Sequence, residues 1–183
     1  MKKNQNDMTP PAVENARQSD TTPHDVAHQL AAVQSQIKTA TDQRPMHYGD
    51  APVTLVAVSK RQPELKIEAA LAAGQRVFGE NRVQEASQRW TGRRTAYSDL
   101  ILHLIGPLQT NKAAEAVALF DVIEVVDREK LAWALSKEMT RQNRFLPCYI
   151  QVNTGEESQK SGILPDQLEG FIQFCRDQLA LPI

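Results

Sequence analysis

The sequence predicts an α/β protein with a parallel sheet, and a (β/α) barrel of the TIM type is the arrangement that we favour. Five short apolar runs alternate with helix-like segments, and each run is apolar almost throughout, as in parallel strands that are covered on both faces. The runs begin roughly 24 residues apart, which is typical of β/α units. No G-x-G-x-x-G motif follows the first run, which disfavours a dinucleotide-binding sheet.

The first predicted element is a helix that follows a polar N-terminal segment. Residues 1–21 are polar and contain a Pro-Pro pair, so we expect a disordered tail there and a partial barrel domain over 22–183. Thr22 suits the N-cap of the helix, Pro23 its first position, and Asp25 the acid of a capping box. Its expected core-facing stripe is Val26, Leu30, Val33 and Ile37. We expect a loop over residues 41–52.

The remaining elements alternate along the chain. The predicted strands are residues 54–59, 76–80, 100–106, 120–127 and 147–153. The first intervening helix has Pro63 near its start and Gly74 just past its end, the expected asymmetry. A later helix starts at Asp127, a plausible N-cap, and the last one opens with Pro165. Their predicted core stripes are Leu131, Leu135 and Met139 in the former, and Leu168, Phe171, Ile172, Cys175 and Leu179 in the latter.

Five strands do not close a barrel of eight. Either the sheet is open and complete, or the chain is truncated at its C-terminus. We favour truncation, because an exposed parallel edge promotes aggregation.

Composition excludes several classes of protein. The net charge is −1, from 21 Lys and Arg against 22 Asp and Glu, and aromatic residues are only 5%, so we expect binding to neither nucleic acid nor an anionic membrane. No apolar run approaches the roughly 18 residues of a membrane span, and no secretory signal is present, so we expect a cytoplasmic protein. Cys148 and Cys175 lack metal-ligand spacing, and we interpret them as buried, reduced thiols.

Lys60 is the first candidate for chemistry, because it stands at the carboxyl end of the first strand, where active sites of such barrels lie. Apolar surroundings destabilise the charged form of a lysine, which leaves a free amine able to attack a carbonyl and form a Schiff base. The alternative is a strand-end lysine that extends into solvent, and position alone favours this alternative.

Residues at the ends of the other predicted strands help to decide between a reactive and a solvent-exposed Lys60. Asn81 offers an amide to an oxygen-rich ligand, or else caps the next helix. His103 faces either the barrel interior or the helices, and a core histidine that binds a backbone carbonyl is the role favoured from the residues alone. Gly79 and Gly106 allow close approach of a ligand, or form tight turns.

Four motifs in order carry a family resemblance: AVSKRQP, FGENRVQEA, LHLIGPLQTNK and NTGEESQKSGI. With them the chain resembles the pyridoxal-phosphate homeostasis protein family over about residues 25–183. The departures are Arg82, where an aromatic residue is common, and the inserted loop TGRRTAYSD.

The resemblance implies a barrel similar to the N-terminal domain of alanine racemase, with pyridoxal 5′-phosphate held by an imine to Lys60. It also implies that Asn81, His103 and Gly106 line the cofactor pocket. Lys160 matches a second lysine of the family that takes part in handing the cofactor on, although from the residues alone we favour a solvated loop position. The family's phosphate-binding Gly-Met-Ser and Arg-x-Gly segments are missing from this chain, so we expect weak or no stable cofactor retention.

Three functions compete. The favoured one is a monomeric cofactor-binding and carrier protein, not an enzyme, whose partners are the cofactor and the apoenzymes that require it. The second is a racemase-like enzyme dependent on pyridoxal phosphate, although the opposing tyrosine that such racemases take from a second domain has no counterpart here. The third is a Schiff-base aldolase, for which Glu80 and Asp127 are the available carboxylates; Glu80 is more simply a charge at a helix N-terminus.

Overall fold

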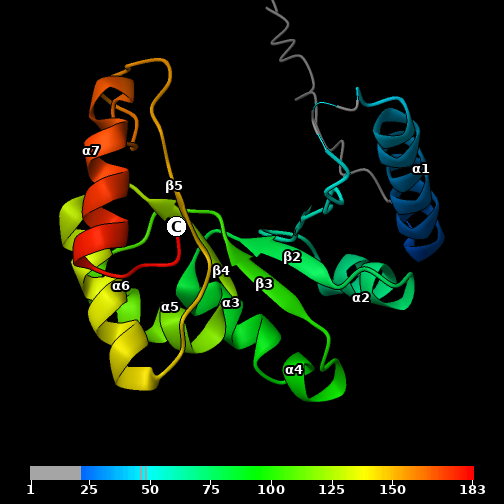
Figure 1. The fold of residues 1–183 in the computed structure, drawn as a ribbon. Coiled ribbons are helices and arrows are strands. Elements are labelled where there is room, and N and C mark those ends of the chain that lie inside the picture. The colour runs from blue at the N-terminus through cyan, green and yellow to red at the C-terminus, as the bar shows by residue number, and fades with distance from the viewer. Residues whose placement is uncertain (1–21, 46, 48) are drawn as a thin grey trace, which may run out of the picture.

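Five parallel strands form one sheet whose spatial order, β1-β2-β3-β4-β5, is the order in the chain (Figure 1). A computed structural model describes residues 22–45, 47 and 49–183, so the predicted tail over residues 1–21 lies outside the described residues. The strands are β1 Ala57–Val58, β2 Val77–Glu80, β3 Ile101–Leu104, β4 Val122–Val126 and β5 Cys148–Ile150. A sheet that grows in one direction without a reversal of strand order is the arrangement of a barrel, not of a doubly wound sheet. The prediction of a partial α/β barrel is confirmed.

The helices alternate with the strands as predicted, except that the short helix α4 forms within the predicted loop TGRRTAYSD. They are α1 Pro23–Asp42, α2 Glu64–Ala72, α3 Val83–Trp90, α4 Arg93–Ala96, α5 Ala113–Leu119, α6 Glu129–Gln142 and α7 Leu168–Gln173. Short 3-10 turns, η2 Thr110–Lys112 and η3 Pro165–Gln167, precede α5 and α7, and a π-helical turn, η4 Phe174–Gln178, follows α7.

The start of α1 has the predicted capping box. The side chain of Thr22 accepts a hydrogen bond from the backbone N–H of Asp25, and the Asp25 carboxylate accepts one from the N–H of Thr22 at 2.8 Å. The predicted loop begins slightly later than residue 41, because the helix continues to Asp42. The apolar stripe of α1 is only partly buried, since Val33 remains 41% exposed.

The residues that begin and end α2 and α6 are largely as predicted. Pro63 precedes α2, and Gly74 follows it with a φ of +89°, in the left-handed region that glycine favours. The N-cap of α6 is Arg128, so the prediction of Asp127 is wrong by one residue. The Asp127 carboxylate binds the guanidinium of Arg128 instead of a helix N–H.

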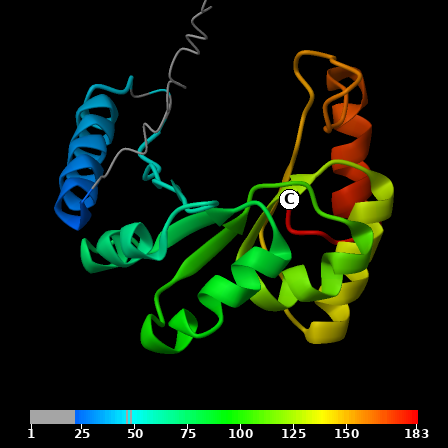
Figure 2. The same cartoon turned by 180° about the vertical axis from the view of Figure 1, so that it is seen from behind.

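The core lies between the sheet and the helices that follow its strands, α3, α5 and α6 (Figures 1 and 2). Side chains alternate along β3, so that Leu102 and Leu104 are fully buried toward the helices while Ile101 is 40% exposed on the opposite face. The predicted stripe of α6 is buried at Leu131, Leu135 and Met139. The other face of the sheet, which we call the open face, carries exposed apolar residues such as Tyr149.

The C-terminal segment returns to the sheet beside β5. The backbone N–H of Cys148 donates to the carbonyl oxygen of Pro182 at 2.7 Å, which places the last residues against this strand (Figure 1). Cys148 and Cys175 are both buried, free thiols, as predicted.

Candidate functional site

The predicted site residues gather at one edge of the sheet. Lys60 follows β1, Asn81 follows β2, and Gly106 follows β3, while His103 lies inside β3. Because neighbouring strands are parallel, the carboxyl ends of all of them meet at this edge. The topology therefore brings these four residues to one side of the molecule.

Lys60 lies in a tight turn that closes directly after β1. The N–H of Gln62 donates to the carbonyl oxygen of Ser59 at 3.1 Å, so Lys60 and Arg61 occupy the two central positions of the turn. Arg61 has a φ of +58°, in the left-handed region, which costs a residue other than glycine about 1–2 kcal/mol. Such a conformation persists only where the surroundings hold it.

Lys60 directly follows Ser59 at the carboxyl end of β1. The side chain of Ser59 is buried on the helix side, where its hydroxyl donates to the Glu80 carboxylate at 2.7 Å. Since successive side chains of an extended segment alternate, Val58 falls on the opposite side. Lys60 is exposed, and in the described part of the chain its amine has neither a hydrogen bond nor an ion pair. No carboxylate among those residues competes for it.

Gly106 and Asn81 join the ends of β3 and β2 in direct backbone contact. A Cβ atom at Gly106 would lie 2.4 Å from the carbonyl oxygen of Asn81, so only glycine fits there without a shift of backbone. The N-cap of α3 is Arg82, with no side-chain hydrogen bond, so the alternative in which Asn81 caps this helix is wrong. Asn81 instead lines a cavity of about 700 Å³ at the carboxyl ends of β2, β3 and β4, whose wall also includes Pro107 and Asp127.

His103 lies on the open face and pairs with a carboxylate from the next strand. Its Nδ1 is 2.5 Å from Oε1 of Glu124 in β4. The expectation of a backbone carbonyl partner is therefore wrong. Glu124 was missed from the sequence, although one signal was available: it is the single charged residue in the apolar run VIEVV, and parallel pairing of β3 with β4 puts it on the face of His103.

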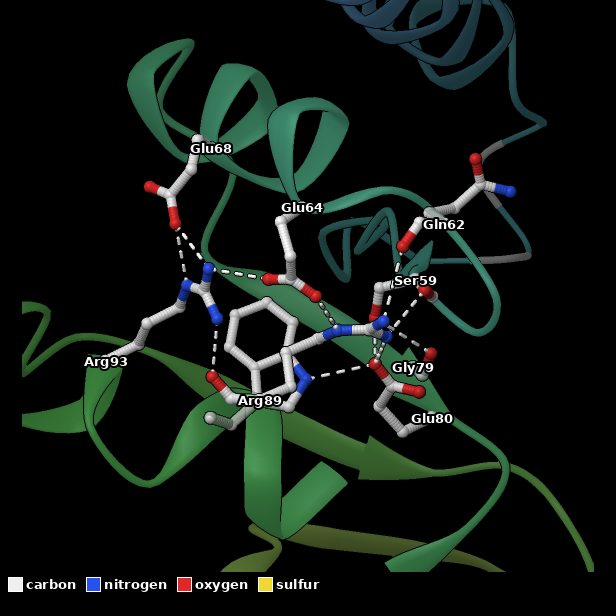
Figure 3. Close-up of polar contacts among 9 residues, drawn as sticks. Ser59, Gln62, Glu64, Glu68, Gly79, Glu80, Arg89 and Arg93 are labelled. Carbon is white, nitrogen blue, oxygen red and sulfur yellow. Dashed lines mark hydrogen bonds and ion pairs between the residues drawn. The ribbon is translucent and has the colours of Figure 1, made fainter. Parts of the chain in front are cut away.

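A buried polar cluster lies under the turn that carries Lys60 (Figure 3). Glu80, fully buried at the end of β2, accepts hydrogen bonds at its Oε1 from the Ser59 hydroxyl, from Nη1 of Arg89 at 2.8 Å and from Nε1 of Trp90 at 3.0 Å. Its Oε2 is buried with no hydrogen bond to any of the described residues. Glu80 faces α3 and the core, so both of its predicted roles, a helix N-terminal charge and an aldolase carboxylate, are wrong.

Two arginines extend this cluster to the surface. Nε of Arg89 binds Glu64 at 3.0 Å, and Arg93 binds both Glu64 and Glu68 (Figure 3). Burial by itself would raise the pKa of Glu64, but the hydrogen bonds from Arg89 and Arg93 outweigh burial and hold this pKa below its ordinary value. The carboxylate therefore stays ionised, and the ion pairs tie α2 to α3 and α4.

The second lysine that the family resemblance singles out has an ion-pair partner of its own. Lys160, in the loop after β5, forms an ion pair with Glu157, and its side chain is 61% exposed, consistent with the solvated loop position. Tyr97 packs beneath Arg76, whose guanidinium lies 4.9 Å from the ring centroid. The described residues contain no group of His, Cys, Asp and Glu side chains placed to hold a metal ion. No helix in residues 22–45, 47 and 49–183 has the length and hydropathy that crossing a membrane requires.

Comparison of the sequence with protein families matches residues 29–182 to the family described as alanine racemase, N-terminal domain. A protein of Haemophilus influenzae named pyridoxal phosphate homeostasis protein is 36% identical over 143 residues, which are 78% of this chain and 60% of the relative. The protein of the same name from Escherichia coli is 37% identical over 149 residues, 80% of this chain and 62% of the relative. The chain thus spans about three fifths of the length of these curated relatives.

Solved structures agree with this similarity. PipY of Synechococcus elongatus with PLP bound is 38% identical and has a TM-score of 0.65, with 80% of this chain and 62% of PipY covered. PipY without PLP has a TM-score of 0.70, with 83% of this chain and 65% of PipY covered. A solved relative thus combines this arrangement of strands with a bound cofactor.

Proposed function

The chain belongs to the alanine racemase N-terminal domain family, and from this premise we propose that it binds pyridoxal 5′-phosphate and serves the homeostasis of this cofactor. One observation carries the proposal: the amine of Lys60 is exposed and unpaired, within the described residues, at the carboxyl end of β1. Barrels of this kind place their reactive groups at that end. Sequence relatives are named for this cofactor, and a solved relative of similar structure has it bound.

Lys60 holds the cofactor as a Schiff base. The cofactor supplies an aldehyde, the Lys60 amine forms a C=N bond to its carbon, and one water leaves with the aldehyde oxygen and two hydrogens from the amine. The residues present fit such a ligand, because a lysine without a carboxylate partner needs to break no ion pair before it reacts. Asn81 and His103 provide hydrogen-bonding groups at the same edge, and Gly106 supports Asn81 through its backbone contact.

The phosphate group has fewer partners in these 183 residues. The Gly-Met-Ser and Arg-x-Gly segments that the family resemblance assigns to phosphate binding do not occur in the sequence. A doubly charged group without hydrogen-bond donors is held weakly. We therefore expect the imine to form in the presence of excess cofactor and to be lost when that excess is removed.

A carrier role suits this site better than catalysis. Control of reactions on the cofactor needs acids and bases placed around the imine. Glu80 is committed to the buried cluster with Arg89 and Trp90, and Asp127 is paired with Arg128, so neither carboxylate is free to transfer protons at the imine. Exchange of the α-proton of an added amino acid, catalysed by the loaded protein, would establish the alternative of a racemase-like enzyme.

The test is a spectroscopic titration with pyridoxal phosphate. Wild-type protein should develop the visible absorbance of an imine, and Lys60→Ala should not. Lys137→Ala, which removes an exposed lysine in the middle of α6, is the control and should behave as wild type. Equal absorbance in the Lys60→Ala variant would refute the assignment of the lysine.

A further inference from the structure

Arg89 holds the backbone on both sides of Lys60. Its Nη1 donates to the carbonyl oxygen of Ser59 at 2.9 Å, and its Nη2 donates to the carbonyl oxygen of Gln62 at 3.2 Å (Figure 3). Ser59 directly precedes Lys60, and Gln62 closes the turn that contains it. One side chain from α3 therefore bridges the two ends of the turn that carries the candidate amine.

The turn itself needs such support. Arg61, at its third position, has a φ of +58°, a conformation that residues other than glycine and asparagine rarely adopt. Within the turn, the hydrogen bond from Gln62 to Ser59 is the contact that closes it. Arg89 binds the Ser59 carbonyl that this bond also uses and, in addition, the carbonyl of Gln62, so its two bonds oppose relaxation of the turn to a more common backbone conformation.

Arg89 is itself immobilised. Its Nη1 also binds the fully buried Glu80 at 2.8 Å, and its Nε binds Glu64 at 3.0 Å, so the side chain is only 14% exposed. Glu80 belongs to β2, and its Oε1 accepts from Ser59 and Trp90 as well. The guanidinium thus connects the turn to the sheet through the buried carboxylate of Glu80.

We propose that Arg89 is a positioning residue for Lys60: by binding the carbonyl oxygens of Ser59 and Gln62 it fixes the turn from which the Lys60 amine reaches the cofactor. This inference rests on the proposed function, because it concerns the same amine. Arg89 acts on the Lys60 amine through the backbone of the turn. By restricting the turn to fewer backbone conformations, it lowers the conformational entropy that is lost when the Lys60 amine bonds the cofactor, and so favours formation of the imine.

The experiment compares three variants of the protein with the wild type. Arg89→Met removes every polar contact, and Arg89→Lys keeps the positive charge beside Glu80 but cannot reach both carbonyl groups with a planar fork. Arg93→Met is the matched control, because Arg93 also binds Glu64 from the same region but contacts neither Ser59 nor Gln62. The fraction folded is measured for each variant by chemical unfolding.

Two readouts are taken. Hydrogen exchange at the backbone amide of Gln62 reports the turn without any cofactor, and we expect it to accelerate about tenfold or more in Arg89→Met and to stay near wild type in Arg93→Met. Titration with pyridoxal phosphate reports the consequence, and we expect the apparent dissociation constant to rise about tenfold in Arg89→Met and by less in Arg89→Lys. A general loss of stability would change the exchange rate and the dissociation constant in the Arg93→Met control as well as in the Arg89 variants.

The outcomes separate the two proposals. If wild-type protein forms no imine at Lys60, the proposed function is wrong, and this inference fails with it. If the wild type forms the imine and the Arg89 variants match it in exchange and in affinity, the positioning role is overturned while the function stands. If Arg89→Met does not fold, Arg89→Lys decides by the same two readouts.

Discussion

Replacement of Gly106 by alanine tests how tightly the ends of β2 and β3 are packed at the candidate site. A Cβ atom at this position would lie 2.4 Å from the carbonyl oxygen of Asn81, 2.7 Å from its Cα and 2.9 Å from its carbonyl carbon. All three are backbone atoms, so no change of rotamer can relieve the clash. The strand ends must move apart, and the residue that moves is one of those proposed to face the cofactor.

The expected cost follows from the size of that clash. Overpacking of a well-packed region by a methyl group typically costs 1–3 kcal/mol, and about 1–3 kcal/mol is the loss that we expect in the free energy of unfolding of Gly106→Ala. In a domain of this size the melting temperature should fall by roughly 2–10 °C. Urea unfolding followed by circular dichroism measures the free energy, and a calorimetric scan measures the temperature.

Gly170→Ala is the matched control. Gly170 lies within α7, and a Cβ atom there would meet nothing within 4 Å. Alanine in a helix interior is favoured over glycine by about 0.5–1 kcal/mol, so this variant should be slightly more stable than wild type. A Gly106→Ala variant whose free energy of unfolding lies within about 0.5 kcal/mol of the wild-type value would refute the close contact with Asn81.

Two further predictions concern the two buried thiols and the partly buried carboxylate of Asp121. Burial raises the pKa of the Cys148 thiol to about 12 and that of Cys175 to about 11, from an ordinary value of 9.0. Between the pKa of the unfolded chain and that of the folded protein, both thiols are protonated in the folded state and ionised in the unfolded state. The free energy of unfolding should therefore fall as pH rises from 9.0 toward about 12. The Cys148→Ala variant should show a weaker dependence on pH. Asp121 pairs with Arg94 at 2.6 Å and Arg144 at 2.8 Å and accepts the N–H of Leu102, so Asp121→Asn should lose about 2–4 kcal/mol in urea unfolding. Asp99→Asn, which breaks one exposed pair with Arg76, should lose less than about 1 kcal/mol; equal losses would contradict this account of Asp121.

Features that depend on local periodicity could be predicted from the sequence. The stripe from Leu131 to Met139 is buried as its spacing indicates, and the capping box of Thr22 and Asp25 forms as its residue types indicate. Both depend on contacts a few positions apart in the chain. The five strands were predicted for a similar reason, although the ladder of β1 is limited to Ala57–Val58, shorter than its apolar run.

Features that depend on long-range pairing could not be predicted. Glu80 was interpreted as a charge at a helix N-terminus, yet its carboxylate binds Arg89 and Trp90, residues nine and ten positions later. The partner of His103 comes from a neighbouring strand, 21 positions away, and depends on register between β3 and β4. Periodicity indicates which face of a strand or helix a residue occupies, but it does not identify the side chain of another element that binds it.

The most direct test of the central claim is to identify the lysine that bonds the cofactor. Wild-type protein is incubated with excess pyridoxal phosphate, reduced with borohydride to make the bond permanent, digested, and mapped by mass spectrometry. We predict that the modified peptide contains Lys60 and that the Lys60→Ala protein lacks a dominant adduct. A dominant adduct on Lys160, or on any lysine other than Lys60, would contradict the assignment of the site.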